Sequence, residues 1–268
     1  MQLSSEKKRK KAIEMEVVEE DRCRSCFNSW VMQQEVDLQE LLQTLTQYPR
    51  DEEKLRMVVE KNIQHFQEYN EKRTILAQDH APSFFCPAWC TSFENSFLWI
   101  AGCRPTLSIR LVYALCGSEL EAQLGEFLRG VRRGNLAELS ASQLNLVNDL
   151  HCNTIREEDK LSSKMASLQE EIADQPLALM AMESNRVGDT SERVDRVLDG
   201  HALGLAAILE DADKLRLRTL KELTNILTPL QGVDLLVATR KLHLSLHEWG
   251  KKRESKQRHS TTISCSAE

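Results

Sequence analysis

Residues 93–117 read FENSFLWIAGCRPTLSIRLVYALCG, the most apolar stretch of comparable length in the chain. Thr91 and Glu94, at its start, have the spacing of a capping box, in which a hydroxyl and a carboxylate bond free amides of a helix's first turn. The pattern predicts one helix over residues 91–102, ended by a turn that contains proline, and a second over residues 106–116. Because helices that are apolar on nearly every side lie buried, we expect these two short helices to form the hub of an all-helical domain.

Elsewhere the chain repeats apolar residues at spacings of three and four, the period of an amphipathic helix. No segment alternates with a period of two over the length of a strand, and the 268 residues include only six prolines and ten glycines. The sequence therefore predicts an all-α fold, a multi-helix bundle of long antiparallel helices around the short buried hub. We expect a helical domain over residues 21–253, between a disordered basic and acidic tail at 1–20 and a disordered tail at 254–268.

Composition argues against several classes of protein. The longest uninterrupted apolar runs have six residues, too few to span a membrane, and residues 1–20 contain no apolar segment typical of secretory signals. The formal net charge of −6 gives no support to direct DNA binding, despite short basic runs near both ends. The sequence also contains no phosphate-binding loop, nucleophile elbow, metalloprotease helix or dinucleotide fingerprint. We therefore expect a protein that is not an enzyme.

The eight cysteines leave two interpretations open. Cys23 and Cys26 form one close pair, and Cys86 and Cys90 form another. A zinc site would need these two pairs to meet across about sixty residues of chain. The alternative places the cysteines singly in the helical core or on its surface, and without a secretory signal disulfides are not expected. We favour the alternative.

Two histidines near the C-terminus, His243 and His247, are the one pair with the spacing of metal ligands. Residues four apart on a helix lie on one face, so both imidazoles could reach the same ion. Arg240 falls on the same narrow face. The alternative is that the two histidines are hydrogen-bonded between packed helices, and composition alone favours this alternative.

An aromatic pair near the N-terminus, Phe27 and Trp30, also admits two interpretations. The two side chains are close to one helical turn apart and belong to the apolar stripe of the first predicted helix. They are either core residues or exposed anchors, and exposed aromatic anchors are strong hot spots for a partner protein. Both interpretations stay open.

Longer stretches of the chain match a known family. Residues 93–105, FENSFLWIAGCRP, resemble the hallmark of the DOG domain, which plant TGA-type bZIP transcription factors share with delay-of-germination seed-dormancy proteins. Residues 215–231, LRLRTLKELTNILTPLQ, resemble the second hallmark of this domain. Residues 110–118, RLVYALCGS, and 241–250, KLHLSLHEWG, are similar to the seed-dormancy branch of the family. The resemblance covers residues 22–253, and no basic leucine zipper precedes it.

The resemblance implies a nuclear, non-enzymatic regulator of seed dormancy and germination in a plant, with the cytoplasm as a second location. It implies that the protein binds and restrains type 2C protein phosphatases of abscisic-acid signalling, and that it self-associates. The alternative function is that of a transcriptional co-regulator that partners bZIP factors through its helical surface, in the regulation of transcription.

The resemblance also implies a haem site. Members of the dormancy branch bind haem through two C-terminal histidines, which match His243 and His247, and Arg240 would pair with a haem propionate. Because one helix can place only one axial ligand on a given haem iron, we expect the two histidines to be unequal.

The phosphatase-binding segment of the family falls on residues 25–31, SCFNSWV. Phe27 and Trp30 keep the aromatic character of that segment, whereas Ser29 replaces an acidic residue. The resemblance thus implies that Phe27 and Trp30 contact a partner protein.

Overall fold

The computed structural model describes residues 2–128, 134–174, 176–183 and 192–265. Every regular element among them is helical, which confirms the predicted all-α fold. The α-helices are α1 (Gln2–Gln47), α2 (Glu52–Phe85), α3 (Ser92–Asn95), α4 (Thr106–Leu128), α5 (Ala141–Glu170), α6 (Leu177–Glu183), α7 (Glu192–Ile226) and α8 (Pro229–Cys265). Two short 3-10 helices, η1 (Leu136–Glu138) and η2 (Glu171–Ala173), precede and follow α5.

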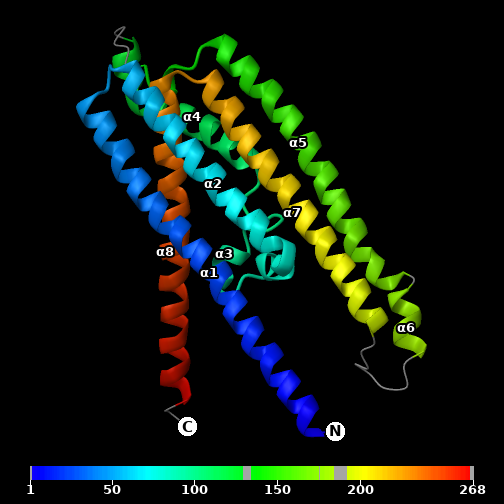
Figure 1. The fold of residues 1–268 in the computed structure, drawn as a ribbon. Coiled ribbons are helices and arrows are strands. Elements are labelled where there is room, and N and C mark those ends of the chain that lie inside the picture. Colours follow the sequence, from blue (N-terminus) through cyan, green and yellow to red (C-terminus); the bar gives the residue numbers. More distant parts are fainter. Residues whose placement is uncertain (1, 129–133, 175, 184–191, 266–268) are drawn as a thin grey trace.

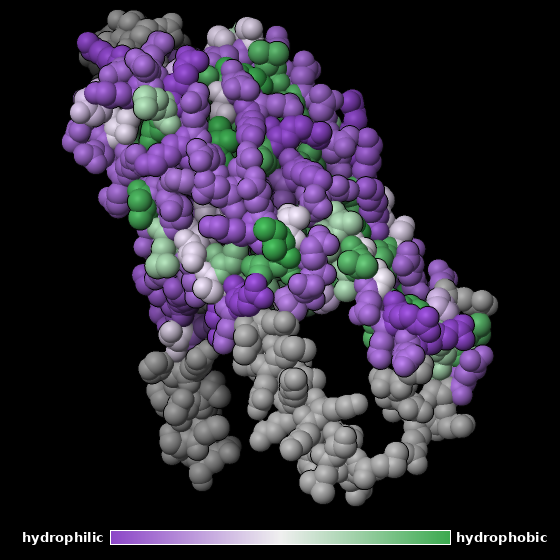
Figure 2. All heavy atoms as spheres, viewed as in Figure 1, coloured by the Kyte–Doolittle hydropathy of each residue, from purple (hydrophilic) through white to green (hydrophobic). Residues whose placement is uncertain are grey.

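The long helices form a layer with two further helices across its back. Helices α1, α2, α7 and α5 lie side by side in that order, and α8 and α4 pack behind them (Figure 1). The front of this layer is mostly hydrophilic, with small hydrophobic spots between the polar side chains (Figure 2). The layer therefore turns its apolar residues toward neighbouring helices, as amphipathic helices do.

Three clusters of buried apolar side chains hold the helices together. The first lies mainly between α2, α5 and α7 and includes Ala77, Phe84, Leu161, Leu205 and Leu209. The second joins α1, α2 and α8 and includes Leu41, Leu55, Val58, Val233 and Leu236. The third joins α4, α5, α7 and α8 and includes Ile109, Val112, Val147, Leu223 and Leu235. Removal of this apolar surface from water is the main favourable term in folding.

The predicted hub differs from the observed structure. The capping box at Thr91 and Glu94 is present, but α3 ends after four residues and none of them is buried. The chain then folds back on itself in a tight turn, closed by an isolated bridge between Trp99 and Gly102. The helix predicted over residues 91–102 is therefore wrong.

The physical reason is that the carbonyl groups of this turn bond arginines rather than helix amides. Ile100 and Ala101 have φ angles of 44° and 56°, a region that residues with a Cβ seldom occupy. Arg216, from α7, donates to the carbonyl oxygen of Ile100 at 2.8 Å, and Arg73, from α2, donates to that of Ala101 at 2.7 Å. Both guanidinium groups are buried beside the carboxylate of Asp213. Since these donors satisfy the carbonyls, the turn does not need to continue as a helix.

The second predicted hub helix is present but longer than expected. Helix α4 begins at Thr106 and continues through Gly117, because one glycine inside a helix costs only about 1 kcal/mol relative to alanine. Ile109 and Val112 are fully buried, whereas Leu107 is 46% exposed. Helix α4 is therefore one member of the bundle with an exposed side, and the buried hub of two short helices does not exist.

Both ends of the chain extend beyond the other helices as single helices, the beginning of α1 and the end of α8 (Figure 1). The division into a domain at 21–253 and two tails stays a prediction. Residues 1 and 266–268 of the two tails lie outside the described residues.

Candidate functional site

Helices α1 and α8 pack against one another, and their contact brings the aromatic pair and the histidine pair together. The rings of Phe27 and His247 meet edge to face, with centroids 5.8 Å apart. The guanidinium carbon of Arg240 lies 4.9 Å from the centroid of the Trp30 ring, a cation–π contact. We call this region, formed by Phe27, Trp30, Arg240, His243 and His247, the α1–α8 junction.

The capping box of α3 holds His247 in place. Nδ1 of His247 lies 2.6 Å from Oε1 of Glu94. The imidazole is the donor in this hydrogen bond, because a carboxylate oxygen accepts. The other carboxylate oxygen of Glu94 accepts from the backbone amide and the hydroxyl of Thr91, at 2.9 and 2.8 Å. One carboxylate thus caps α3 and orients an imidazole of α8, and it leaves Nε2 of His247 for another partner.

His243 lies one turn earlier on α8. Its side chain is half-buried, and its Nδ1 is enclosed without a hydrogen-bond partner. Burial lowers the pKa of His243 to about 4, and the positive charge of Arg240 acts in the same direction. His243 is therefore a neutral imidazole at physiological pH, and the structure makes the two histidines unequal.

Arg240 is buried and engaged with α1 and α2. Its Nη2 lies 3.6 Å from Oδ2 of Asp37 and donates to Oδ1 of Asn62 at 3.4 Å. Burial lowers the pKa of Arg240 to about 10, and the carboxylate of Asp37 offsets part of this effect. The other carboxylate oxygen of Asp37 lies 2.8 Å from Nδ1 of His65. This buried charge network ties three helices together and occupies the guanidinium that was expected to meet a propionate.

The structure places Trp30 in the core and Phe27 at its edge. The Trp30 ring is 7% exposed and stacks on Tyr69 with centroids 4.7 Å apart. Burial raises the pKa of the Tyr69 hydroxyl well above its usual value. Phe27 is half-buried against His247. The packing therefore favours the core interpretation for Trp30.

A groove of about 400 Å³ opens beside this aromatic stack, between α1 and α2. Ser25 and Ser29 line its α1 side together with the edge of Trp30, and Lys72 and Ile75 are among its α2 residues. Both serines are exposed. The segment expected to bind a phosphatase thus presents its polar residues to an open groove.

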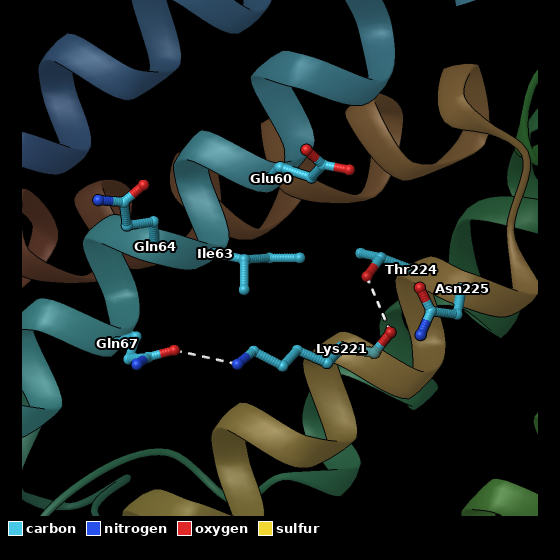
Figure 3. A pocket seen from close by; sticks show the side chains of 7 residues that line it. All are labelled: Glu60, Ile63, Gln64, Gln67, Lys221, Thr224 and Asn225. Carbon is cyan, nitrogen blue, oxygen red and sulfur yellow. Dashed lines mark hydrogen bonds between the residues drawn. The ribbon is translucent and has the colours of Figure 1, made fainter. Parts of the chain in front are cut away.

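A second cavity, of about 350 Å³, lies between α2 and α7 and is lined mostly by polar side chains (Figure 3). Lys221 reaches across it and donates to Oε1 of Gln67 at 3.0 Å. Neither this cavity nor the groove is lined by His243 or His247.

The surroundings of His247 are those of a histidine that could ligate iron. A carboxylate on Nδ1 is the common way in which proteins orient a ligating histidine, and the pair formed by His247 and Glu94 has this arrangement. The packing adds a condition, since Phe27 lies against the imidazole of His247. A haem would therefore need the Phe27 ring to move away from this imidazole.

The described part of the chain gives no support to the zinc alternative. None of the seven cysteines that it places forms a disulfide, and no group of three or more His, Cys, Asp or Glu residues suited to a metal ion lies among the described residues. Nor does any helix in that part have the length and apolar character needed to cross a membrane.

Three residues position the junction in roles that were not foreseen from the sequence. Asp37 and Asn62 carry no motif, and an acid or amide within a helical pattern usually lies on the solvated side. Glu94 was expected as a helix cap, but its second role toward His247 joins positions 153 residues apart. No local pattern contains that information.

Known proteins similar to this chain identify its family. The family model DOG1, described as seed dormancy control, matches residues 37–114. Protein DOG1-like 3 of Arabidopsis thaliana is 39% identical over 245 residues, which cover 87% of this chain and 86% of that protein. The chain belongs to the DOG1-like family. Protein DOG1-like 1 of the same plant is 37% identical over 254 residues, covering 87% of this chain and 90% of the relative.

A more distant similarity reaches a transcription factor. Transcription factor TGA2 of Arabidopsis thaliana is 26% identical over 213 residues, which cover 78% of this chain and 57% of the factor. These matches confirm the resemblance to the DOG domain. The segment matched by the DOG1 model contains Asp37, Asn62 and Glu94, so the buried partners of Arg240 and His247 lie inside it, whereas the junction residues themselves lie outside it.

Replacement of Trp30 by alanine should destabilise this DOG1-like protein by about 3–5 kcal/mol, because it removes a buried ring from the core. Met32→Ala, at a side chain that is 59% exposed on the same helix, should change the free energy of unfolding by no more than about 0.5 kcal/mol. Urea unfolding of both variants checks this. If Trp30→Ala is as stable as Met32→Ala, Trp30 is a surface anchor and not a core residue.

The lowered pKa of His243 predicts a pH dependence of stability. The unfolded chain takes up a proton near pH 6.5 and the folded chain only near pH 4, so stability is complete above pH 6.5 and falls as the pH is lowered toward 4. Between pH 7 and pH 5, wild type should lose about 2 kcal/mol more than His243→Gln. His201→Gln, a half-buried histidine of α7, should retain the wild-type pH dependence. Equal losses in wild type and His243→Gln would contradict the half-buried, neutral imidazole.

Proposed function

We propose that this DOG1-like protein is a non-enzymatic regulator of seed dormancy and germination that acts by binding other proteins. The observation that carries the proposal is its similarity to DOG1-like proteins along 86–90% of their length, together with the match to a family described as seed dormancy control. Self-association belongs to the same proposal and stays a prediction.

The partners proposed are type 2C protein phosphatases of abscisic-acid signalling, which the chain would bind and restrain. The support on α1 is the exposed side of residues 25–31, where Ser25 and Ser29 border the open groove. Phe27 and Trp30 then contribute to partner binding mainly indirectly. They hold α1 against α2 and α8 and so position the exposed serines. The link to abscisic acid draws support from a relative named Protein RESPONSE TO ABA AND SALT 1, which is 27% identical over 75% of this chain.

A second candidate is a transcriptional co-regulator that partners bZIP factors. The observation that favours it is the similarity to Transcription factor TGA2 and Transcription factor TGA5, over 78% and 82% of this chain. The same similarity supports a nuclear location, with the cytoplasm as the second location. In this reading the helical surface, rather than a DNA-binding segment, makes the contact.

Haem binding at α8 is the third part of the proposal, with His247 as the iron ligand and His243 in a supporting role. When bound, haem would supply an iron centre whose state depends on its axial ligands and surroundings. The support is the carboxylate of Glu94 on Nδ1 of His247 and the enclosed, unpartnered Nδ1 of His243. Arg240 would have to leave Asp37 to meet a propionate. We therefore assign Arg240 primarily to the ion pair that joins α8 to α1.

Capture from seed extract tests the phosphatase proposal. The full chain is immobilised, and the captured material is probed for type 2C phosphatases and for bZIP factors. Ser29→Arg adds a bulky charge to the groove on α1 and should reduce phosphatase capture at least about tenfold with an unchanged melting temperature. Ser167→Arg, the same change at an exposed position of α5, should have no effect.

Phosphatase capture that is equal for wild type and Ser29→Arg would remove the α1 groove from the proposal. Capture of bZIP factors without phosphatase would replace the first candidate by the second.

A haem titration tests the unequal roles of the two histidines. His247→Ala should lose the Soret band almost completely, because it removes the oriented ligand, whereas His243→Ala should only weaken or shift the band. His201→Ala serves as the control and should bind as wild type does. Unchanged spectra in both α8 variants would return His243 and His247 to a packing role.

A further inference from the structure

Helix α8 carries a stripe of apolar residues. Helix α4 covers the beginning of this stripe, and the stripe continues beyond α4. Leu235 is fully buried in the cluster that α4 shares with α8. Leu242, Leu246 and Trp249 follow on the same side of α8, since seven residues make close to two turns. Leu242 is 43% exposed and Trp249 is 55% exposed. The stripe thus passes from a covered to an uncovered surface.

This uncovered part of α8 is rigidly attached to the body of the protein. A Cβ on Gly250 would collide with the side chain of Thr91, so this side chain packs directly against the backbone of α8. The backbone amide of Ser92 donates to Oε1 of Glu254 at 2.8 Å. On the helix surface Gly250 and Glu254 lie beside the stripe rather than on it. A partner would therefore meet a surface that is already ordered, which lowers the entropy lost on binding.

The charges beside the stripe are basic. Residues 241–257 contain five basic and two acidic residues, in a chain whose net charge is −6. Arg253 continues the stripe by one turn, and its guanidinium lies 6.0 Å from the ring centroid of Phe93. Lys252 flanks the stripe. Both acids face other sides, where Glu248 pairs with Lys251 at 3.3 Å and Glu254 accepts from α3.

We propose that Leu242, Leu246 and Trp249, with Lys252 and Arg253, form a docking site for an acidic amphipathic helix of a partner protein. The apolar residues would take the apolar face of that helix, in continuation of the packing of α4, and the basic residues would pair with its acids. The stripe from Leu242 to Arg253 is about 16 Å long, or three helical turns. A second copy of this chain fits less well, because its own stripe offers no acidic residue to pair with Lys252 and Arg253.

This site goes beyond the proposed function, since it lies on a different element from the α1 groove and on a different side of α8 from His243 and His247. Phosphatase capture and haem binding can therefore fail or succeed without deciding whether the stripe binds a helix.

The test uses the full chain and a fluorescent peptide of about 14 residues, with leucine every three or four positions and glutamate elsewhere. Anisotropy should report binding that weakens as NaCl rises from about 50 to about 500 mM. Trp249→Ala and Arg253→Glu should each weaken binding at least about tenfold. Matched controls are Met57→Ala, at a 63% exposed side chain of α2, and Arg56→Glu, also exposed on α2. Both controls should bind as wild type does.

Three outcomes would overturn the proposal. One is that the glutamate peptide binds no more tightly than a lysine peptide of the same pattern. Another is binding of anionic phosphatidylserine vesicles that depends on Trp249 and Arg253 while the peptide does not bind, which would make the stripe a membrane contact. The third is a dimer of the wild type that is lost in Trp249→Ala, which would make the occupant a second copy.

Discussion

One buried carboxylate, that of Asp213, holds the two guanidinium groups on which the shape of the central turn depends. Its Oδ1 lies 2.7 Å from Nη1 of Arg216 and 3.5 Å from Nη1 of Arg73. The two arginines together donate to four carbonyl oxygens of the turn, those of Trp99, Ile100, Ala101 and Cys103, at 2.6–2.8 Å. Buried charges persist only when they are paired and hydrogen-bonded. The positive φ angles of the turn are stable because these charge-assisted bonds offset their cost.

The same turn also contributes to the position of the α1–α8 junction. It fixes the chain that leaves α3, and α3 carries the carboxylate of Glu94 that orients His247. Helix α8 is then held against α1 by a second buried ion pair, between Arg240 and Asp37, and by the ring of Trp30. The charge network of Asp213, that of Asp37 and the helix cap of Glu94 therefore connect the core to the residues of the α1–α8 junction. A change in either network should reach the junction through packed contacts rather than through a flexible segment.

The sequence predicts much of the fold and part of the site. Helical periodicity and the capping box of Thr91 and Glu94 are local signals, and both are confirmed. The turn at Ile100 and Ala101 was predicted as helix because its residues are apolar, whereas its donors, Arg73 of α2 and Arg216 of α7, lie 28 and 116 residues away in the sequence. The same limit applies to Trp30, whose burial depends on Tyr69 and Arg240 on other helices. Spacing places His243 and His247 on one face, but only tertiary contacts make them unequal.

The most direct test of this account is amide hydrogen exchange in the turn of Asp213→Asn. We expect the amides of Trp99 and Gly102, which bond across the turn at 2.7 and 3.2 Å, to exchange at least about tenfold faster than in wild type. Amides in the middle of α5 should keep their wild-type rates. Asp211→Asn, at a partly exposed acid that pairs with Lys164 on the surface, should leave the turn unchanged. A folded Asp213→Asn protein with wild-type exchange at Trp99 and Gly102 would contradict the account.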